Sequence, residues 1–304
     1  MKRFLLLSCI VGLFVLATLA AGEWFVRSIP NPYSSKHHWM LQHADSMELL
    51  ILGSSHTYYG INPIYLKART YNLANSAQPY KYDYYLLTHY ANHYCQLHTV
   101  ILPVSYFSMF GKGFVEDSWV GNINYKIYME CPFYSDFSKY NLELSQPDVY
   151  RGKLLKVLMG EEPLNCTEFG WGDQYTLATK NTGWEDSSAK AAANRHTAKE
   201  WDHLEENKGY FEKIAAFCKE HNIQLILITT PTWHAYYDRL DSKQLEKMYE
   251  IIEEMKQKYG LPYYDYLKDA RFEADDFWDS DHLSDKGAEK FTRILQQDLF
   301  DPHK

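Results

Sequence analysis

The stretch ELLILGSSH, residues 48–56, joins a short apolar run to a turn of small polar residues. The run is apolar at every position after Glu48, as expected for a strand that is buried on both faces of a sheet. Gly53 permits a tight turn directly after the strand. The stretch therefore predicts the first strand of a buried parallel sheet, with a helix that begins close to Ser55.

Four further runs of the same kind follow, at 70–73, 99–104, 223–229 and 263–267. Between and after them lie segments with apolar residues at helical spacing, at about 80–94, 202–221, 242–259 and 286–299. Apolar strands that alternate with amphipathic helices are typical of a parallel sheet covered by helices on both faces. The sequence therefore predicts an α/β fold with a central parallel sheet.

One long segment, at about 107–201, breaks this alternation. It is rich in Gly, Asn, Tyr and Trp and shows little periodicity, so we expect an insertion over the carboxyl ends of the strands, where such folds bind ligands. The expected organisation is an N-terminal membrane anchor or signal peptide at 1–27, a polar tether at 28–45, and the α/β domain with its insertion at 46–304.

Composition excludes some classes of partner. The 304 residues include 31 Lys and Arg against 39 Asp and Glu, for a formal charge of −8 and without a basic cluster. This balance argues against nucleic acid as the main partner. The chain has 26 Tyr, 15 Phe and 8 Trp, and such amphipathic rings suit wet or sugar-rich surfaces. A Tyr-rich periphery of the core is the alternative.

The N-terminus predicts the compartment. Lys2 and Arg3 precede the charge-free, mostly apolar stretch Phe4–Ala21, which would be about 27 Å long as a helix, close to the roughly 30 Å of a bilayer core. We expect a single-pass anchor in a bacterial cell membrane, with the bulk of the chain outside the cytoplasm. The alternative is a signal peptide cleaved near Thr18-Leu19-Ala20, which would leave a secreted or periplasmic protein.

The cysteines carry no recognisable metal or redox motif. Cys95, Cys131, Cys166 and Cys218 show no C-x-x-C spacing, which argues against a zinc ribbon or a thioredoxin-like site. Export permits disulfides, and Cys131 with Cys166 is the first pair to test. Free buried thiols are the alternative.

Two short motifs carry the chemistry. Ser55 follows the first strand on a tight turn, which would present its hydroxyl beside the backbone N–H groups of the next helix. Near the C-terminus, the sequence DSDHL at 279–283 follows the last strand and precedes the last helix. Asp279, three residues before His282, could hold one imidazole nitrogen, leaving the other free to take a proton from a serine. Helix capping by Asp279 or Asp281 is the alternative for this loop.

Together these motifs resemble those of the SGNH (Gly-Asp-Ser-Leu type) hydrolase superfamily, over about Glu48 to the C-terminus. The resemblance implies a flavodoxin-like three-layer α/β/α fold, and ester hydrolysis or acyl transfer by a Ser-His-Asp triad. Carried over to this chain, Ser55 is the nucleophile, His282 the general base and Asp279 its orienting carboxylate. With its membrane segment, the sequence is closer to the branch of alginate O-acetylation and D-alanyl-lipoteichoic acid transfer proteins.

The chain departs from that family at the oxyanion hole. The segment after the second strand, NLANS at 72–76, lacks the family's Gly, and VSY at 104–106 lacks its Gly-x-Asn. Donors aimed at a developing oxyanion are often the largest catalytic contribution. The hole must therefore be built differently, from the Ser55 N–H with Asn75 as a candidate second donor, or the chain is a poor hydrolase. Asn75 could equally be a turn residue.

The remaining candidates are weaker. His89 and His93 have a spacing that can hold a metal, but no carboxylate or Cys pair completes the set, so we expect no metal site and no cofactor. His56, beside Ser55, could contact substrate or point into the first helical turn. Trp233 and His234, after the fourth strand, could form a sugar-stacking rim or pack as loop residues.

The predicted function is that of an envelope-anchored serine esterase or O-acyltransferase that acts on a cell-surface glycan or related polymer. The alternative, from another class, is a non-catalytic polymer-binding or scaffold protein that supports a membrane-bound O-acyltransferase. An intact set of Ser55, His282 and Asp279 favours catalysis, whereas the missing oxyanion residues favour the scaffold. Expected partners are the polymer, the membrane and that acyltransferase.

Overall fold

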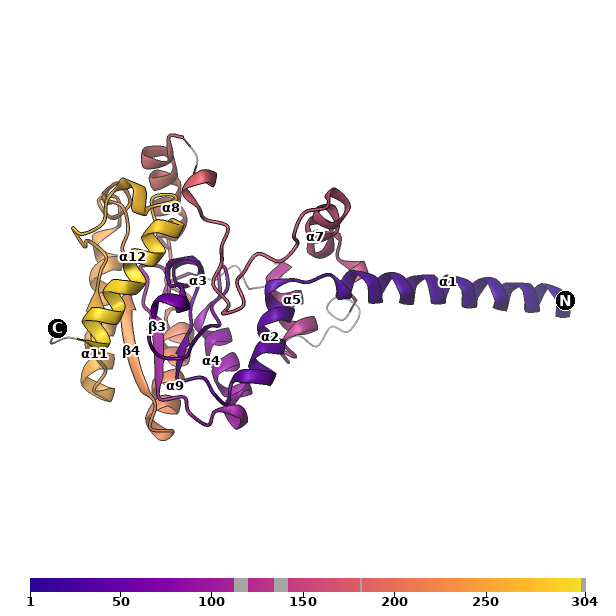
Figure 1. Ribbon diagram of the computed structural model, residues 1–304, viewed down its shortest axis with the longest axis horizontal. Helices are drawn as coiled ribbons and strands as arrows, with labels where there is room; N and C mark the ends of the chain where they lie inside the picture. Colours follow the sequence, from indigo (N-terminus) through magenta and orange to yellow (C-terminus); the bar gives the residue numbers. More distant parts are fainter. Residues whose placement is uncertain (112–119, 134–141, 181, 302–304) are drawn as a thin grey trace. The chain divides into compact units, whose positions relative to one another are not determined.

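The computed structural model describes residues 1–111, 120–133, 142–180 and 182–301 (Figure 1). The chain forms two compact units. Unit 1 comprises Met1–His37 and Asp117–Asn165, and unit 2 comprises His38–Glu116 and Cys166–Lys304. The expected insertion at about 107–201 thus contributes to both units, and the expected boundaries at 27 and 45 stay predictions. Cys131 belongs to unit 1 and Cys166 to unit 2, so their pairing also stays a prediction.

A five-stranded sheet forms the centre of unit 2, and all its strand pairs are parallel. Its strands are β1 (Leu49–Ile51), β2 (Thr70–Asn72), β3 (Thr99–Pro103), β4 (Gln224–Thr229) and β5 (Tyr263–Asp265). Their order, β2-β1-β3-β4-β5, is the flavodoxin-like order. The predicted α/β class is therefore confirmed, and each strand lies within one or two residues of its predicted bounds.

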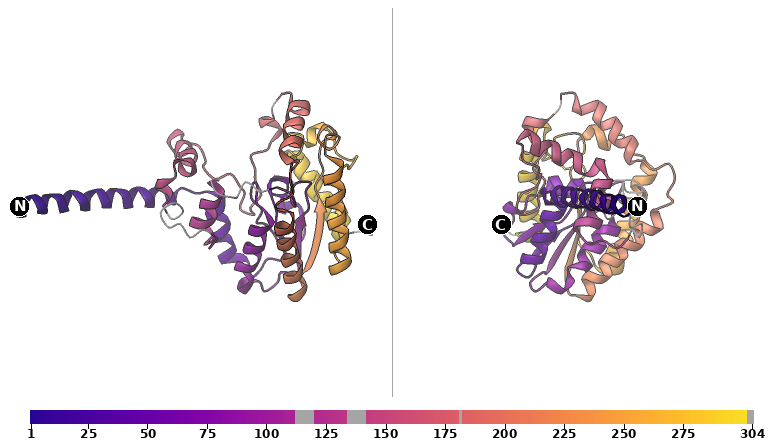
Figure 2. Two further views of the ribbon diagram at one scale, coloured as in Figure 1. Left: turned by 180° about the vertical axis from the view of Figure 1, so that it is seen from behind. Right: turned by 90° about the vertical axis from the view of Figure 1, so that its right-hand side faces the viewer.

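Helices cover both faces of this sheet, as Figure 2 shows. The helices that lie wholly in unit 2 are α3 (Ser55–Gly60), α4 (Tyr80–His89), α8 (Ala189–His196), α9 (Leu204–Glu220), α10 (His234–Tyr237), α11 (Ser242–Tyr259) and α12 (Asp285–Leu295). Phe291 and Leu295 of α12 pack on Leu49, Ile51 and the strands beside them in one core cluster. Because side chains alternate along a strand, the intervening residues face the opposite layer, where α4 packs against α9 and α9 against α11.

Local signals explain most helix ends. Asp241 accepts a hydrogen bond from the Gln244 N–H at 2.9 Å and so caps α11, which ends at Gly260 in the left-handed region, at φ +70°. The Tyr-rich helix α4 ends at His89 rather than at Tyr94, because a 3-10 turn, Ala91–His93, replaces its last predicted turn. Helix α2 (Pro32–His43) occupies much of the expected tether and carries the chain from unit 1 into unit 2.

Unit 1 contains the longest helix, α1 (Lys2–Ser28), together with α5 (Val120–Tyr128), the 3-10 turn η3 (Glu143–Ser145) and α7 (Pro147–Met159). Helix α1 has 27 residues and a mean hydropathy of 2.6 over its most apolar 18-residue window, none of which is buried. By length and composition it can span a membrane.

Candidate active site

The turn after β1 is tightly constrained. Gly53 has φ +110°, and a Cβ at this position would lie 2.2 Å from the Pro103 side chain, so only glycine fits. The Gly53 N–H donates to the Asp83 carboxylate at 2.8 Å, which fastens the turn to α4. Ser54 takes the N-cap position of α3 in an extended conformation, and Ser55 begins the helix. The turn thereby places Ser55 at the carboxyl edge of the sheet.

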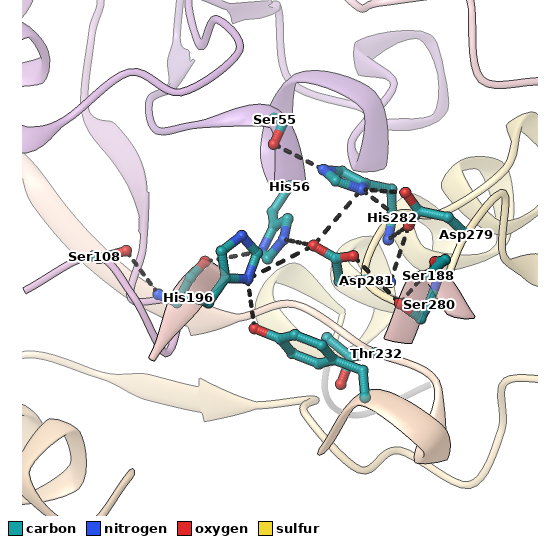
Figure 3. A network of polar contacts seen from close by, with 12 residues as sticks. Ser55, His56, Ser108, Ser188, His196, Thr232, Asp279, Ser280, Asp281 and His282 are labelled. Atoms are coloured by element: carbon teal, nitrogen blue, oxygen red, sulfur yellow. Dashed lines mark hydrogen bonds and ion pairs between the residues drawn. The ribbon is translucent and has the colours of Figure 1, made fainter. Parts of the chain in front are cut away.

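Three of the predicted residues meet at this edge (Figure 3). The Ser55 Oγ lies 2.8 Å from His282 Nε2. His282 Nδ1 lies 3.0 and 3.1 Å from the two carboxylate oxygens of Asp279. An N–H at Nδ1 donates to this carboxylate, which leaves Nε2 to accept the Ser55 proton. Residues 227 positions apart in the sequence are thus joined in the order that nucleophilic catalysis requires.

The loop that carries His282 is held by its own backbone. Asp279 Oδ1 accepts from the backbone N–H groups of Asp281 and His282 at 3.0 and 2.8 Å, so this carboxylate orients both the imidazole and the loop. Ser284 then caps α12 by accepting from Gly287 N–H at 3.2 Å. The predicted capping in this region is therefore done by Ser284, and Asp279 instead contacts the histidine.

A second carboxylate, Asp281, lies beneath the first and is 2% exposed. One of its oxygens, Oδ2, lies 3.4 Å from His56 Nε2, 3.7 Å from His282 Nδ1 and 3.8 Å from His196 Nδ1. Figure 3 shows these three imidazoles around the one carboxylate. Three histidines from separate segments of unit 2 therefore share one buried negative charge.

Hydroxyl groups also contact two of these imidazoles. His56 Nδ1 lies 3.0 Å from the Ser105 hydroxyl, directly after β3, and His196 Nδ1 lies 2.8 Å from the Tyr236 hydroxyl. Ser105, His56 and Asp281 thus form a second Ser-His-Asp line behind the first. Because Ser105 is 2% exposed and His56 is 5% exposed, this second line faces the interior.

Charge and burial act in opposite directions on these groups. Burial lowers the pKa of His282, but the nearby carboxylates of Asp279 and Asp281 outweigh it and raise this pKa to about 9. Burial dominates at His56, whose pKa is lowered, and at His196, whose pKa falls to about 3. Burial raises the pKa of Asp281, but the surrounding imidazoles overcome that effect and hold it below the usual value. His282 is thus the imidazole that carries the proton near neutral pH.

The same groups are a possible metal-ligand set. Single ligand atoms of His56, Asp281 and His282 all lie within 4.8 Å of one another. A cation bound by His282 Nδ1 would compete with Asp279, which contacts the same nitrogen at 3.0 Å. A metal held through that nitrogen would therefore displace the contact with Asp279.

Aromatic rings form a wall beside His282. Tyr175 lies between Tyr59 and Trp278, stacked on each with ring centroids 3.8 Å apart. Its ring centroid lies 5.3 Å from that of His282, with the two rings nearly perpendicular. A hollow of about 330 Å³ is lined in part by Trp278 and Asp279. Its lining consists of Thr182, Gly183, Trp184, Ser187, Ser188, Trp278 and Asp279.

The other predicted residues lie at varied places. Asn75 is buried, and its side-chain amide donates to Gln78 Oε1 at 3.1 Å. His56 points inward to Asp281, as described above. Trp233 packs against the core, and its ring centroid lies 5.4 Å from that of Trp184. The His234 side chain is 58% exposed, and its Nδ1 lies 3.8 Å from Asp238 Oδ2. Of the substrate-contact candidates, His234 is the one that faces solvent.

Sequence reasoning missed four residues of the site: Asp83, Tyr175, His196 and Asp281. Asp281 was visible as the second acid of DSDH, but its capping role was the simpler interpretation. Asp83 lies in the predicted Tyr-rich helix, where a single carboxylate among apolar neighbours is the available signal. Tyr175 and His196 lie in the segment without periodicity, and nothing local predicts where they point.

The chain is similar to one family model and to solved structures. Residues 191–299 match a family model described as a protein of unknown function, DUF1574. No curated protein matches the sequence. Among solved structures, the chain is similar to the crystal structure of a "putative acylhydrolase" from Bacteroides fragilis NCTC 9343, at 11% identity and a TM-score of 0.43, covering 88% of this chain and 96% of that one.

Proposed function

We propose that the protein is a membrane-anchored serine esterase or O-acyltransferase that acts on ester groups of a cell-surface glycan or related polymer. In the first half-reaction, Ser55 Oγ attacks the ester carbonyl while His282 Nε2 takes its proton. The proton then passes to the leaving alcohol oxygen, and an acyl-Ser55 ester remains. In the second half-reaction, water or a polymer hydroxyl gives its proton to His282 and attacks the acyl group, and His282 returns that proton to Ser55 Oγ as the acyl–Ser55 bond breaks.

The contact of Ser55 with His282 and of His282 with Asp279 is the observation that carries this proposal. A general base must lie within about 2.6–3.2 Å of the proton it abstracts, and the oxygen–nitrogen distance of 2.8 Å meets that condition. The bond from Asp279 fixes the tautomer in which Nε2 is free to accept.

The proposed substrate class, a cell-surface glycan, is inferred from the apolar helix α1 and from the groups that surround His282 and Asp279. The anchor-length apolar helix keeps the reaction at a membrane, and the stacked Tyr59, Tyr175 and Trp278 offer a flat wall beside the base. Aromatic faces with polar edges suit sugar rings. The hollow beside Asp279 supplies hydroxyl groups from Ser187 and Ser188, which can bond to a carbohydrate.

The direct test is acyl release from an O-acetylated envelope polysaccharide, together with acyl transfer to its deacetylated form. The wild-type chain should perform at least one of these reactions, and Ser55→Ala should abolish it. Ser54→Ala is a matched control, because the neighbouring hydroxyl is buried and lies away from the His282 contact. Equal activity in the wild type and Ser55→Ala would exclude the esterase proposal.

A second function has one supporting observation. Asn75, the sequence candidate for the oxyanion hole, already donates to Gln78, and the segment 72–76 that follows β2 lacks the family's glycine. A chain without a competent oxyanion hole could serve as a polymer-binding scaffold for a membrane-bound O-acyltransferase. In that case, Ser55→Ala would restore polymer acylation in cells that lack the protein as fully as the wild type does.

A further inference from the structure

The charged residues near the end of helix α1 indicate where the hydrocarbon core of the membrane ends. Its charge-free stretch runs from Phe4 to Gly22, about 28 Å of helix, which matches the hydrocarbon thickness of a bilayer. Glu23 and Arg27 follow and form an ion pair at 2.5 Å. Because charged groups are costly in hydrocarbon, the apolar core must end close to Glu23.

Hydrogen bonds and an ion pair join η3 and α7 of unit 1 to the end of α1. The Glu23 carboxylate accepts from the backbone N–H groups of Glu143 and Leu144, both at 2.9 Å. On α7, the Lys153 ammonium donates to the Val26 carbonyl at 2.5 Å and forms an ion pair with Glu143 at 2.7 Å. Lys153 and Glu143 are buried, so this junction is an internal part of unit 1.

Helix α7 turns an apolar surface away from that junction. Leu155, Leu158 and Met159, called here the apolar patch, are 54%, 72% and 68% exposed. At 100° per residue, all three project from the side of α7 opposite Lys153, as does the exposed Arg151. Three large apolar side chains at i, i+3 and i+4 are the pattern of a helix face that meets an apolar medium.

We propose that the apolar patch of α7 inserts into the headgroup region of the membrane that α1 spans, so that unit 1 contacts the lipid surface at a second place. This inference rests on the anchoring part of the proposed function. It adds a lipid-binding surface at residues 155–159 that is independent of the chemistry at Ser55.

The position of the apolar patch along the membrane normal favours lipid as the medium that covers it. Val26, which Lys153 binds, lies four residues or about 6 Å beyond Gly22. The interfacial region on each side of the hydrocarbon is about 5–7 Å thick. The patch lies within two helical turns of Lys153 and therefore close to this layer. Trp24, at 73% exposure, marks the same level, where aromatic rings gather at membrane surfaces, and Arg151 suits the phosphate of a headgroup.

The test measures where the patch lies. Leu158 is replaced by p-acetylphenylalanine, which carries a ketone-reactive nitroxide, and the full chain is reconstituted into phosphatidylcholine/phosphatidylglycerol vesicles. Power-saturation EPR then compares collisions with oxygen, which dissolves in lipid, and with NiEDDA, which stays in water. We expect the label at 158 to gain oxygen collisions and lose NiEDDA collisions relative to a label at Glu246, an exposed position on α11.

Two outcomes would overturn the inference. High NiEDDA collisions at 158 would place the patch in water, and low collisions with both reagents would mean that protein covers it. A label at Leu13, in the middle of α1, reports separately whether the anchor is in hydrocarbon, so failure of the anchor is distinguishable from failure of the patch.

Charge substitution gives a second readout with a matched control. In the double variant Leu155→Glu, Leu158→Glu, a label at Met159 should move from the lipid to the water reading while circular dichroism stays unchanged. Ile64→Glu, which changes another exposed apolar side chain but in unit 2, should leave the Met159 reading as it is. If the double variant leaves the label in lipid, the apolar side chains are not what holds α7 there.

Discussion

At the residue scale, the site combines one partly buried line of groups, for which we propose a catalytic role, with a fully buried line behind it. Ser55, His282 and Asp279 form the first, and Asp281 links His282 to His56 in the second. A base with two carboxylates around it is well oriented, but it also binds its proton more tightly. The arrangement therefore predicts both loss of activity on truncation and an unusual pH dependence.

Removing either end of the Ser55–His282 contact should disable the same step. Ser55→Ala and His282→Ala should each lower ester turnover by on the order of 10³ or more, and the double variant should lose little beyond either one. Steady-state kinetics with a chromogenic ester measures this, with thermal melts to show that the fold remains. Losses that multiply in the double variant would mean that the two groups act in separate steps.

The pH dependence follows from the state of His282. The base must be neutral to accept the Ser55 proton, and its pKa is raised to about 9, so kcat/KM should rise with pH through about 9. Asp281→Asn removes one of the two nearby negative charges, so the rise of kcat/KM, called here the alkaline limb, should move to lower pH. Asp275→Asn, whose carboxylate is exposed and lies near Lys286, should leave the limb in place.

NMR titration of His282 in the Ser55→Ala chain checks the same shift without relying on turnover. A downward change in the imidazole pKa on adding Asp281→Asn is the expected result. Arg195 lowers the pKa of this imidazole, so an unchanged pKa in the Asp281→Asn chain would assign its elevation to Asp279 alone.

At the element scale, the strand-to-helix turn is the most constrained part of the site. A methyl group at Gly53 would collide with Pro103, and the backbone there adopts a positive φ. Gly53→Ala should therefore lower the free energy of unfolding by about 1–3 kcal/mol and displace Ser55. Gly209→Ala on α9 meets no atom within 4 Å and should instead raise it by about 0.5–1 kcal/mol. Chemical denaturation measures both, and equal effects would contradict this view of the turn.

The elements were predictable from the sequence wherever a periodic pattern existed. The ELLIL and IQLILIT runs became β1 and β4, and the segment at 242–259 became α11 with the predicted bounds, because burial imposes its own spacing on apolar residues. The turn residues near Ser55 and His282 were predictable from the tight loops that they require. His196 and Tyr175 were not, because their positions depend on contacts distant in the sequence, such as His196 with Tyr236 and Tyr175 with Trp278.

At the scale of the whole molecule, the chain combines an apolar helix that can span a membrane with a site at the edge of a parallel sheet. We expect the chain to remain in the membrane fraction through Phe4–Ala21 after alkaline carbonate washing, because this helix is apolar at nearly every position. N-terminal sequencing of the mature protein provides the check. A first residue at or after Ala21 would replace the anchor with a cleaved signal peptide and would leave the site itself unaffected.

The central claim is that Ser55 is a nucleophile activated by His282. The most direct measurement is reaction of the full wild-type chain with a fluorophosphonate at pH 9, followed by proteolysis and mass spectrometry of the peptide that contains residues 53–58. The account predicts one phosphonyl adduct, located on Ser55, which disappears in Ser55→Ala and in His282→Ala and persists in Ser54→Ala. An unmodified Ser55 in a folded wild-type chain, or an adduct that survives His282→Ala, would contradict it.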